Sequence, residues 1–262
     1  MFARQSLDRP FTLISLILST VLMLNGCIVI ASPSHANVHQ QKELKLSASS
    51  LKTLDIEVGA GGLIIKGSDQ TTEISVMADI YTNSRSNENY EFELSDSGST
   101  ALLIAKNNHT VSWGGNSPRI NLVVTIPARM MLEIKDGSGG MDISNIIGSV
   151  NINDGSGGIK LNDIIGNVII QDGSGEITLI EIDGDISIDD GSGNIYASGI
   201  SGNANIEDGS GDLTVNNVKG TITLDDGSGD INIEDAGGLK IIEGGSGGLK
   251  VNNVKGAFEI DS

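Results

Sequence analysis

The chain has 262 residues, room for one or two domains, and its 34 acidic and 16 basic side chains give a formal net charge of −18. A surface this acidic repels phosphate backbones and anionic headgroups, so it excludes nucleic acid as a partner and favours cations and basic surfaces. Aromatic residues make up only 3% of the chain against 35 glycines, so the core must consist of small branched side chains, which prefer strands.

The first 36 residues have the features of an export signal. Arg4 and Arg9 precede an uncharged, apolar stretch at 11–31, and a small-x-small tripeptide ends at Ala36. A basic start, an apolar centre and a small-residue end predict a secretory signal peptide over residues 1–36, cleaved after Ala36.

Two alternatives for this segment remain open. The sequence Leu-Asn-Gly-Cys at 24–27 resembles a bacterial lipobox, with Cys27 as the lipid anchor, although Asn25 departs from that motif. The apolar stretch 11–31 is also long enough to span a bilayer uncleaved, since about 20 residues suffice. All three interpretations place the rest of the chain outside the cytoplasm, in the periplasm, at the outer membrane or on the cell surface. They also limit membrane contact to this N-terminal segment.

Residues 37–135 predict an irregular N-terminal β-region that begins the fold and caps it. Alternating apolar residues, the mark of a half-buried strand, occur in several short segments of this region. These segments are 54–58, 63–65, 74–80, 92–94, 102–104 and 120–126. The polar stretches 83–89 and 107–118 predict loops. Trp113 lies in the second loop, where packing beneath the loop and partner contact are both open.

Residues 136–262 are built from an 18-residue repeat that occurs seven times. Positions are counted here from the aspartate of the motif Asp-Gly-Ser-Gly, which recurs at fixed intervals. The motif begins at Asp136, Asp154, Asp172, Asp190, Asp208 and Asp226, and Gly244 replaces the aspartate in the seventh copy. Positions 6, 8, 11, 15 and 17 are predominantly apolar, and position 13 is always glycine.

This pattern predicts a strand at positions 6–8, a bend, a second strand at 15–17 and a glycine-rich turn. Fixed-period repeats of this kind are typical of solenoids, because one coil cannot bury its apolar face alone and stacked coils can. The predicted fold class is therefore all-β: a single parallel β-solenoid, or β-helix, of 18-residue coils with an irregular N-terminal β-region. In the sixth repeat Lys240 occupies position 15, which predicts a bulge or a slip of one residue there.

Several motifs together carry a family resemblance. They are the Gly-rich segment 59–67, the segment Val-Val-Thr-Ile-Pro-Ala-Arg at 123–129, and the repeated Gly-Ser-Gly turns. Over roughly residues 50–262 the chain resembles the bacterial putative-adhesin domain family, a domain of unknown function with Gly-rich β-solenoid repeats. The resemblance implies an extracytoplasmic solenoid with an adhesive or cell-envelope role, and it supplies no catalytic residues.

The repeated serines do not predict a hydrolase. A nucleophile elbow needs a histidine partner, and the chain has no histidine beyond His109. Seven equivalent serines from Ser138 to Ser246 without a base indicate a turn. We therefore assign no catalytic residue, no cofactor-binding residue and no cofactor, and expect a non-enzymatic protein.

The six position-1 aspartates leave two interpretations open. Strand spacing would place them about 4.8 Å apart in one row, where like charges repel. The favoured interpretation is that each side chain accepts backbone N–H groups of its own Ser-Gly turn and so caps it. The alternative is that they bind divalent cations, together with an exposed acidic or amide row at position 18. That row is Asn153, Gln171, Asp189, Glu207, Asp225, Glu243 and Asp261. We assign no metal ligand from the sequence.

Asparagines at positions 9 and 10 predict side-chain amide ladders at the bend. They are Asn162, Asn216 and Asn252 at position 9, and Asn145, Asn217 and Asn253 at position 10.

With no catalytic set assigned, the expected function is an adhesin-like module of the cell envelope that contacts a surface partner, either protein or glycan. A periplasmic structural or envelope-stress regulatory protein is the alternative, and a divalent-cation-binding solenoid is a weaker one.

Overall fold

The computed structural model describes residues 38–82, 89–108 and 118–261, and in these ranges all regular structure is β. The N-terminal strands are β1 (Val38–Ser47), β2 (Thr53–Val58), β3 (Leu63–Ser68), β4 (Glu73–Thr82), β5 (Tyr90–Ser97), β6 (Thr100–Asn107), β7 (Arg119–Pro127) and β8 (Met131–Asp136). No helix of the described ranges is long and apolar enough to cross a membrane. The predicted signal peptide, Cys27, His109 and Trp113 lie outside these ranges.

The repeats contribute the remaining strands, two to a coil. They are β9 (Met141–Ile147), β10 (Val150–Asp154), β11 (Ile159–Ile165), β12 (Val168–Asp172), β13 (Ile177–Asp183), β14 (Ile186–Asp190), β15 (Ile195–Ile200), β16 (Ala204–Asp208), β17 (Leu213–Ser228), β18 (Ile231–Ser246), β19 (Leu249–Val254) and β20 (Phe258–Ile260). β17 and β18 each join the two strand segments of one coil into a single continuous strand.

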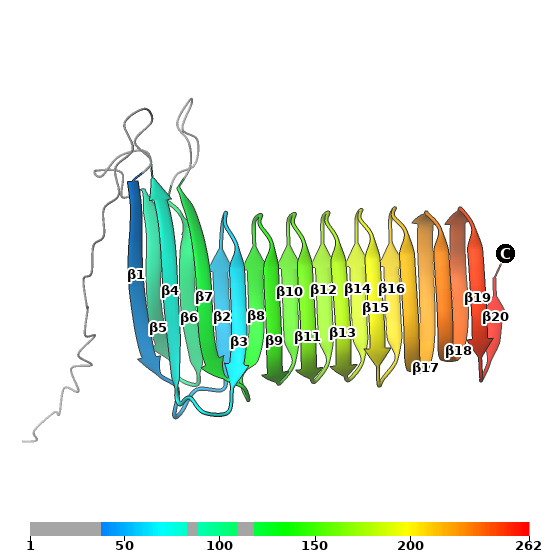
Figure 1. The fold of residues 1–262 in the computed structure, drawn as a ribbon, viewed down its shortest axis with the longest axis horizontal. Helices are drawn as coiled ribbons and strands as arrows, with labels where there is room; N and C mark the ends of the chain where they lie inside the picture. Colours follow the sequence, from blue (N-terminus) through cyan, green and yellow to red (C-terminus); the bar gives the residue numbers. More distant parts are fainter. Residues whose placement is uncertain (1–37, 83–88, 109–117, 262) are drawn as a thin grey trace, which may run out of the picture.

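The coils stack into one elongated column, as Figure 1 shows. From β8 to β16, each strand pairs in parallel with the segment 18 residues later in the chain, for example Val150 with Val168 and Ile159 with Ile177. The predicted parallel β-solenoid of 18-residue coils is therefore confirmed.

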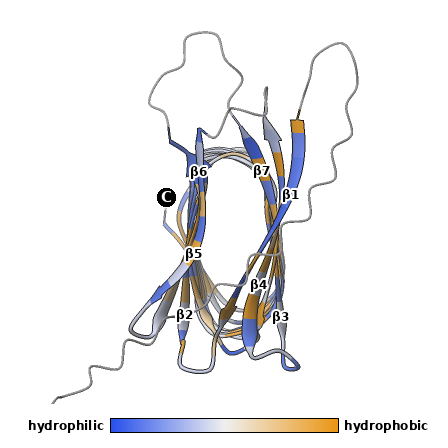
Figure 2. Cartoon of the chain, turned by 90° about the vertical axis from the view of Figure 1, so that its left-hand side faces the viewer, coloured by the Kyte–Doolittle hydropathy of each residue, from blue (hydrophilic) through white to orange (hydrophobic). Residues whose placement is uncertain are grey.

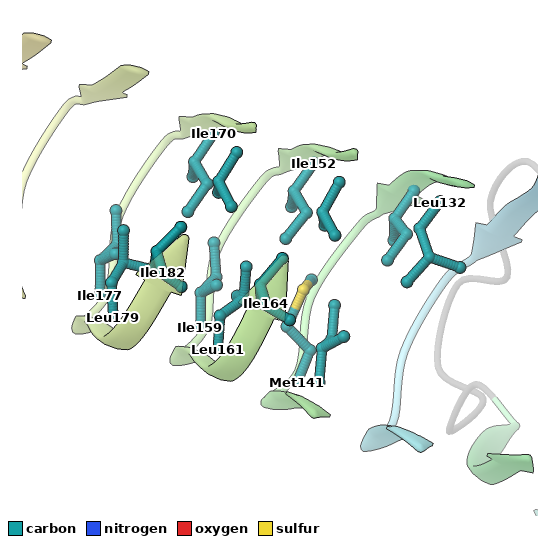
Figure 3. Packing of buried hydrophobic residues seen from close by; sticks show 14 of the residues in the cluster. Leu132, Met141, Ile152, Ile159, Leu161, Ile164, Ile170, Ile177, Leu179 and Ile182 are labelled. Carbon is teal, nitrogen blue, oxygen red and sulfur yellow. The ribbon is translucent and has the colours of Figure 1, made fainter. Parts of the chain in front are cut away.

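The interior of the column is apolar along its length. Figure 2 looks along the column and shows its oval cross-section, and Figure 3 shows the stacked side chains inside. Positions 6, 8 and 11 of one strand face positions 15, 17 and 1 of the other, and in the first five coils these side chains are buried. A single hydrophobic cluster runs from the N-terminal region to Ile241. No coil buries its own core, so stability comes from stacking.

The first strand of each coil is longer than predicted, because the bend lies inside it. The strand runs from position 6 to position 12, and the residue at position 10 has a positive φ between 54° and 74°. This left-handed residue turns the chain, so that the side chains at positions 8 and 11 both point inward. In a regular strand, side chains three residues apart would point to opposite faces. The residues concerned are Asn145, Asp163, Glu181, Gly199, Asn217, Asp235 and Asn253. Asparagine, aspartate and glycine tolerate this conformation best.

Close approach between coils explains the repeated glycines. At position 4, Gly175 has a φ of +149°, and a Cβ added to it would lie 1.6 Å from the carbonyl oxygen of Gly157. At position 13, a Cβ on Gly184 would lie 2.3 Å from the carbonyl oxygen of Gly166. Any larger residue would therefore push neighbouring coils apart.

In the N-terminal region the spatial order of the coils differs from the chain order. The coil of β2 and β3 lies between the β6–β7 coil and the β8–β9 coil, because β2 pairs in parallel with both β6 and β8. β3 pairs likewise with both β7 and β9. Antiparallel strands complete this end of the column: β5 lies on β6, β4 on β7 and β1 on β4.

The predicted irregularity in the sixth repeat is present. The pairing of β17 with β18 shifts by one residue between Val218 and Thr221 and returns to register after Leu224. Lys240 consequently points outward while Leu239 and Ile241 are buried. Ile242, the extra residue, is 41% exposed.

Candidate functional site

The position-1 aspartates are turn caps. Asp136 Oδ1 accepts a hydrogen bond from the backbone N–H of Ser138 at 3.1 Å, and the same contact recurs in each of the next five repeats at 3.1–3.2 Å. Position 1 ends the strand on the same side as the inward positions 15 and 17, so all six side chains are buried. The capping interpretation is confirmed.

The second oxygen of each of these carboxyl groups has no hydrogen-bond partner within the described residues and no contact with solvent. Burial, with smaller contributions from neighbouring aspartates, therefore raises the pKa of Asp136 to about 7 and that of Asp154 to about 6. Burial also raises the pKa of the other four: Asp190 and Asp208 to about 6, and Asp172 and Asp226 in the same direction. Burial in the fold thus favours the neutral form of these carboxyl groups.

The serines and histidines form no catalytic set in the described part of the chain. Ser138 serves its turn through its backbone N–H, and its Oγ lies 3.5 Å from the carbonyl oxygen of Gly59. His39 hydrogen-bonds to Asp79 at 2.8 Å and stacks on Tyr81, on strands of the N-terminal cap. Within the described residues no group of three or more His, Cys, Asp or Glu side chains is arranged to hold a metal ion.

The predicted amide ladders at the bend are wrong in position. Asn145, Asn217 and Asn253 are left-handed residues of the bend. Of these asparagines, within the described residues, only Asn253 donates a side-chain hydrogen bond to the neighbouring coil, to Asp235 of the preceding one. Side-chain ladders occur instead at positions 5 and 14, which flank the tight turns. There a side-chain oxygen of one coil accepts a hydrogen bond from the backbone N–H at the same position of the next coil. The pairs are Asn167 to Asp185, Asp185 to Asn203, Asn203 to Thr221, Asn194 to Asp212, Asp212 to Asp230 and Asp230 to Gly248.

The position-18 row is an outward-facing acidic stripe on the second strand of the coils. Parallel pairing brings Asp189 next to Glu207, Glu207 next to Asp225, and Asp225 next to Glu243. Four consecutive coils therefore present a carboxylate at the same place. Asp189, Glu207 and Glu243 are exposed, and Asp225 is partly exposed.

A groove lies on the opposite strand. It lies along the bend, encloses about 500 Å³, and is lined by positions 10 and 12 of successive coils together with Gly67, Asp69 and Ala128 of the N-terminal region. Its position-12 residues are Ile147, Ile165, Asp183, Ser201 and Lys219. Toward the C-terminus the same corner holds a second hollow of about 350 Å³, which shares Lys219 and adds Asp235 and Lys255. We call the two together the bend groove.

The bend groove changes character along its length. Ile165, at its N-terminal end, is 52% exposed. Asp163 lies in the same coil as Ile165, and the carboxylates of Glu181 and Asp183 lie one coil further on. The far end holds Lys219 and Lys255, with Asp235 in the coil between them. The left-handed residue at position 10 creates the groove, because it turns the strand outward there. Sequence reasoning missed this site; the recurrence of Asn, Asp and Gly at position 10 was the available signal.

Comparison with solved structures finds bacterial proteins of low sequence identity to this chain. A putative cell adhesion protein from Clostridium sporogenes is 16% identical, with a TM-score of 0.36, over 85% of this chain and 98% of that one. A putative adhesin from Bacteroides fragilis is 14% identical, with a TM-score of 0.39, over 84% of this chain and 97% of that one. A putative lipid binding protein from Parabacteroides distasonis is 15% identical, with a TM-score of 0.36, over 86% of this chain and 97% of that one.

No curated protein matches the sequence. The family model described as Toastrack DUF4097, in contrast, matches residues 51–247. This match covers the glycine-rich N-terminal coil and most of the repeats, and it confirms the family resemblance expected from the sequence. The chain belongs to the Toastrack family.

Proposed function

We propose that this protein is a non-enzymatic interaction module exported from the cytoplasm, which presents one rigid face of its solenoid to a partner at the cell envelope or surface. The observation that carries the proposal is the bend groove, an open and chemically varied surface along a column whose every coil is braced by its neighbours. Side chains on such a scaffold are held in place before a partner arrives, which reduces the entropy lost on binding.

The distribution of charge supports the same role. Residues 136–262 hold 22 acidic and five basic side chains, and those at positions 10, 12 and 18 point outward. A strongly acidic face attracts cationic partners and repels anionic ones. No catalytic residue is assigned, in keeping with the arrangement of the serines and histidines of the described chain.

Protease treatment of intact cells tests the proposal. An exported surface module should be degraded by added protease while a soluble periplasmic marker survives, as followed by immunoblot of the full chain. Survival of the chain until the outer membrane is opened would favour the periplasmic alternative. Recovery of the chain in the cytosolic fraction, with the 36-residue N-terminal segment intact, would contradict both.

A further inference from the structure

We infer that the bend groove binds an extended segment of a partner protein whose side chains run from apolar, through basic, to acidic along the groove. This inference rests on the proposed role as an interaction module and names the site and the class of partner.

The dimensions of the groove suit an extended peptide. The first hollow spans the coils from Asn145 to Lys219, and the second continues to Lys255. With coils about 4.8 Å apart and an extended chain rising about 3.4 Å per residue, the full length accommodates roughly eight residues. The peptide would cross the strands at right angles, so its recognition depends on side chains and not on added strand pairing.

The N-terminal end of the groove exposes apolar surface beside the carboxylates of Asp69 and Asp163. Ile165 is 52% exposed although isoleucine is normally buried, and Ile147 beside it is half-buried. Both lie on position 12 in adjacent coils and pair in register, so their side chains form one continuous surface. A leucine-sized side chain of the partner would bury this surface.

The middle of the groove is anionic and its carboxylates are accessible. Asp163 and Asp183 each accept one hydrogen bond from a protein neighbour, from Asn162 at 2.7 Å and from Ser201 at 2.6 Å. The carboxylate of Glu181 accepts none within the described residues and lies over Gly199, where a Cβ would be 2.7 Å from its oxygen. The missing side chain at Gly199 thus makes room for the carboxylate of Glu181 over the next coil. Two or three basic side chains of a partner match this segment.

The far end carries a small net positive charge, because two lysines, Lys219 and Lys255, stand there against one carboxylate, Asp235. Neither Lys219 nor Lys255 forms an ion pair in the described part of the chain, and the two stand on the same row two coils apart. A uniform polycation would meet more positive than negative side chains here, whereas a peptide can place acidic residues beside the lysines. This change in charge favours a peptide over a polyamine, which has one sign of charge throughout.

Fluorescence anisotropy with labelled peptides of roughly eight residues tests the inference, since that length spans the groove. The probes are Leu-Leu-Lys-Lys-Lys-Gly-Glu-Glu, its reverse, and a scrambled peptide of the same composition. One of the two ordered peptides should bind about tenfold more tightly than the scrambled one. The double variant Glu181→Gln/Asp183→Asn should lose about tenfold, because two exposed charge contacts are worth roughly 1.4 kcal/mol together.

The matched control is Glu207→Gln/Asp225→Asn. It changes the net charge by the same amount on the acidic stripe of the opposite strand, and should alter binding less than about twofold. Equal loss in both double variants, equal binding of the scrambled peptide, or full displacement by spermine would each overturn the inference in favour of unspecific charge attraction. Failure of every peptide to bind, in a protein that surface protease removes from intact cells, would overturn the inference alone and leave the proposed function standing.

Discussion

At the scale of single residues, each position-1 aspartate has one carboxyl oxygen that is hydrogen-bonded and one that is buried without a partner within the described residues. The first oxygen closes the turn through the serine N–H. A charged carboxylate in that position pays a desolvation penalty, which the single hydrogen bond only partly offsets. The aspartate row therefore stabilises each turn most effectively when it is protonated.

This arrangement predicts that the protein is more stable in mild acid than at neutral pH. The pKa of Asp136 is raised to about 7 from an unfolded value near 4. The stabilising contribution of Asp136 to the free energy of unfolding is therefore complete below about pH 4, and it is lost as the pH rises through 7. Asp154, Asp190 and Asp208 act in the same direction up to about pH 6. Urea unfolding at pH 5 and pH 8 should give the larger free energy of unfolding at pH 5.

The variant Asp136→Asn isolates one member of the row. Its amide oxygen keeps the hydrogen bond from Ser138 without a charge, so the free energy of unfolding at pH 8 should rise by about 1–3 kcal/mol, since one pKa unit corresponds to about 1.4 kcal/mol. At pH 5 the variant should match the parent. The exposed Asp189→Asn serves as the control, and an equal pH profile in both variants would contradict the assignment.

Glycine substitutions give a second prediction at this scale. Gly175→Ala should lower the free energy of unfolding by at least about 3 kcal/mol, because the strained backbone conformation alone costs 1–3 kcal/mol and the new Cβ meets the backbone of Gly157 at 1.6 Å. Gly158→Ala is the matched control, since its Cβ would meet nothing nearer than 3.8 Å and it should change stability by less than about 1 kcal/mol. Thermal and urea unfolding measure both; equal effects would refute the close-approach argument.

At the scale of elements, a coil is stable only between two neighbours. The coil of β19 and β20 repeats the inward pattern of the others, but Leu249, Phe258 and Ile260 are 45–54% exposed. The same repeat position therefore has a different energetic value at the end of the column than in its middle. Local sequence cannot distinguish the two cases, because only the neighbouring coil decides burial.

Two isoleucines at position 17 test this contrast. Ile188→Ala removes a side chain that is 1% exposed and should cost about 2–5 kcal/mol of unfolding free energy, the range for large-to-small changes in a core. Ile260→Ala, at 45% exposure, should cost less than about 1 kcal/mol. Equal costs would mean that another chain segment or a second molecule covers the terminal coil in solution.

At the scale of the whole molecule, the column concentrates negative charge on one long body. Residues 37–135 are nearly balanced, with nine basic and 11 acidic side chains, whereas the repeats carry 22 acidic side chains and five basic ones. Self-repulsion of this kind destabilises the compact state and is screened by salt within about 10 Å at 0.1 M.

Salt should therefore stabilise the protein. The melting temperature should rise by a few degrees between about 10 and 200 mM sodium chloride, because screening weakens repulsion along the acidic stripe and the groove. Calcium chloride at matched ionic strength, compared with EDTA, separates screening from a specific site. A similar small shift is expected if the stripe is simply solvated. An additional rise of many degrees with calcium would instead support the divalent-cation alternative.

The repeat unit by itself determined the solenoid. An 18-residue period with apolar residues at fixed positions permits few arrangements, because every coil must bury the same face and only stacking achieves this. The aspartate cap was predictable because position 1 lies on the same side of the strand as the inward positions 15 and 17. The bulge was predictable because Lys240 occupies an inward position in the sixth repeat. The family resemblance was also evident in motifs such as the segment 59–67.

Only the tertiary structure decided the order of the N-terminal coils, the bend groove and the raised pKa values of the aspartates. The insertion of the β2–β3 coil between β6–β7 and β8–β9 depends on long-range pairing that local patterns do not encode. The bend groove exists because left-handed residues stack in register, so its apolar, acidic and basic segments come from residues 18 positions apart in the chain. The raised pKa values of the aspartates likewise arise only when stacking removes water from the turns. Burial and proximity are properties of the assembled column, and for this reason a single repeat could not reveal them.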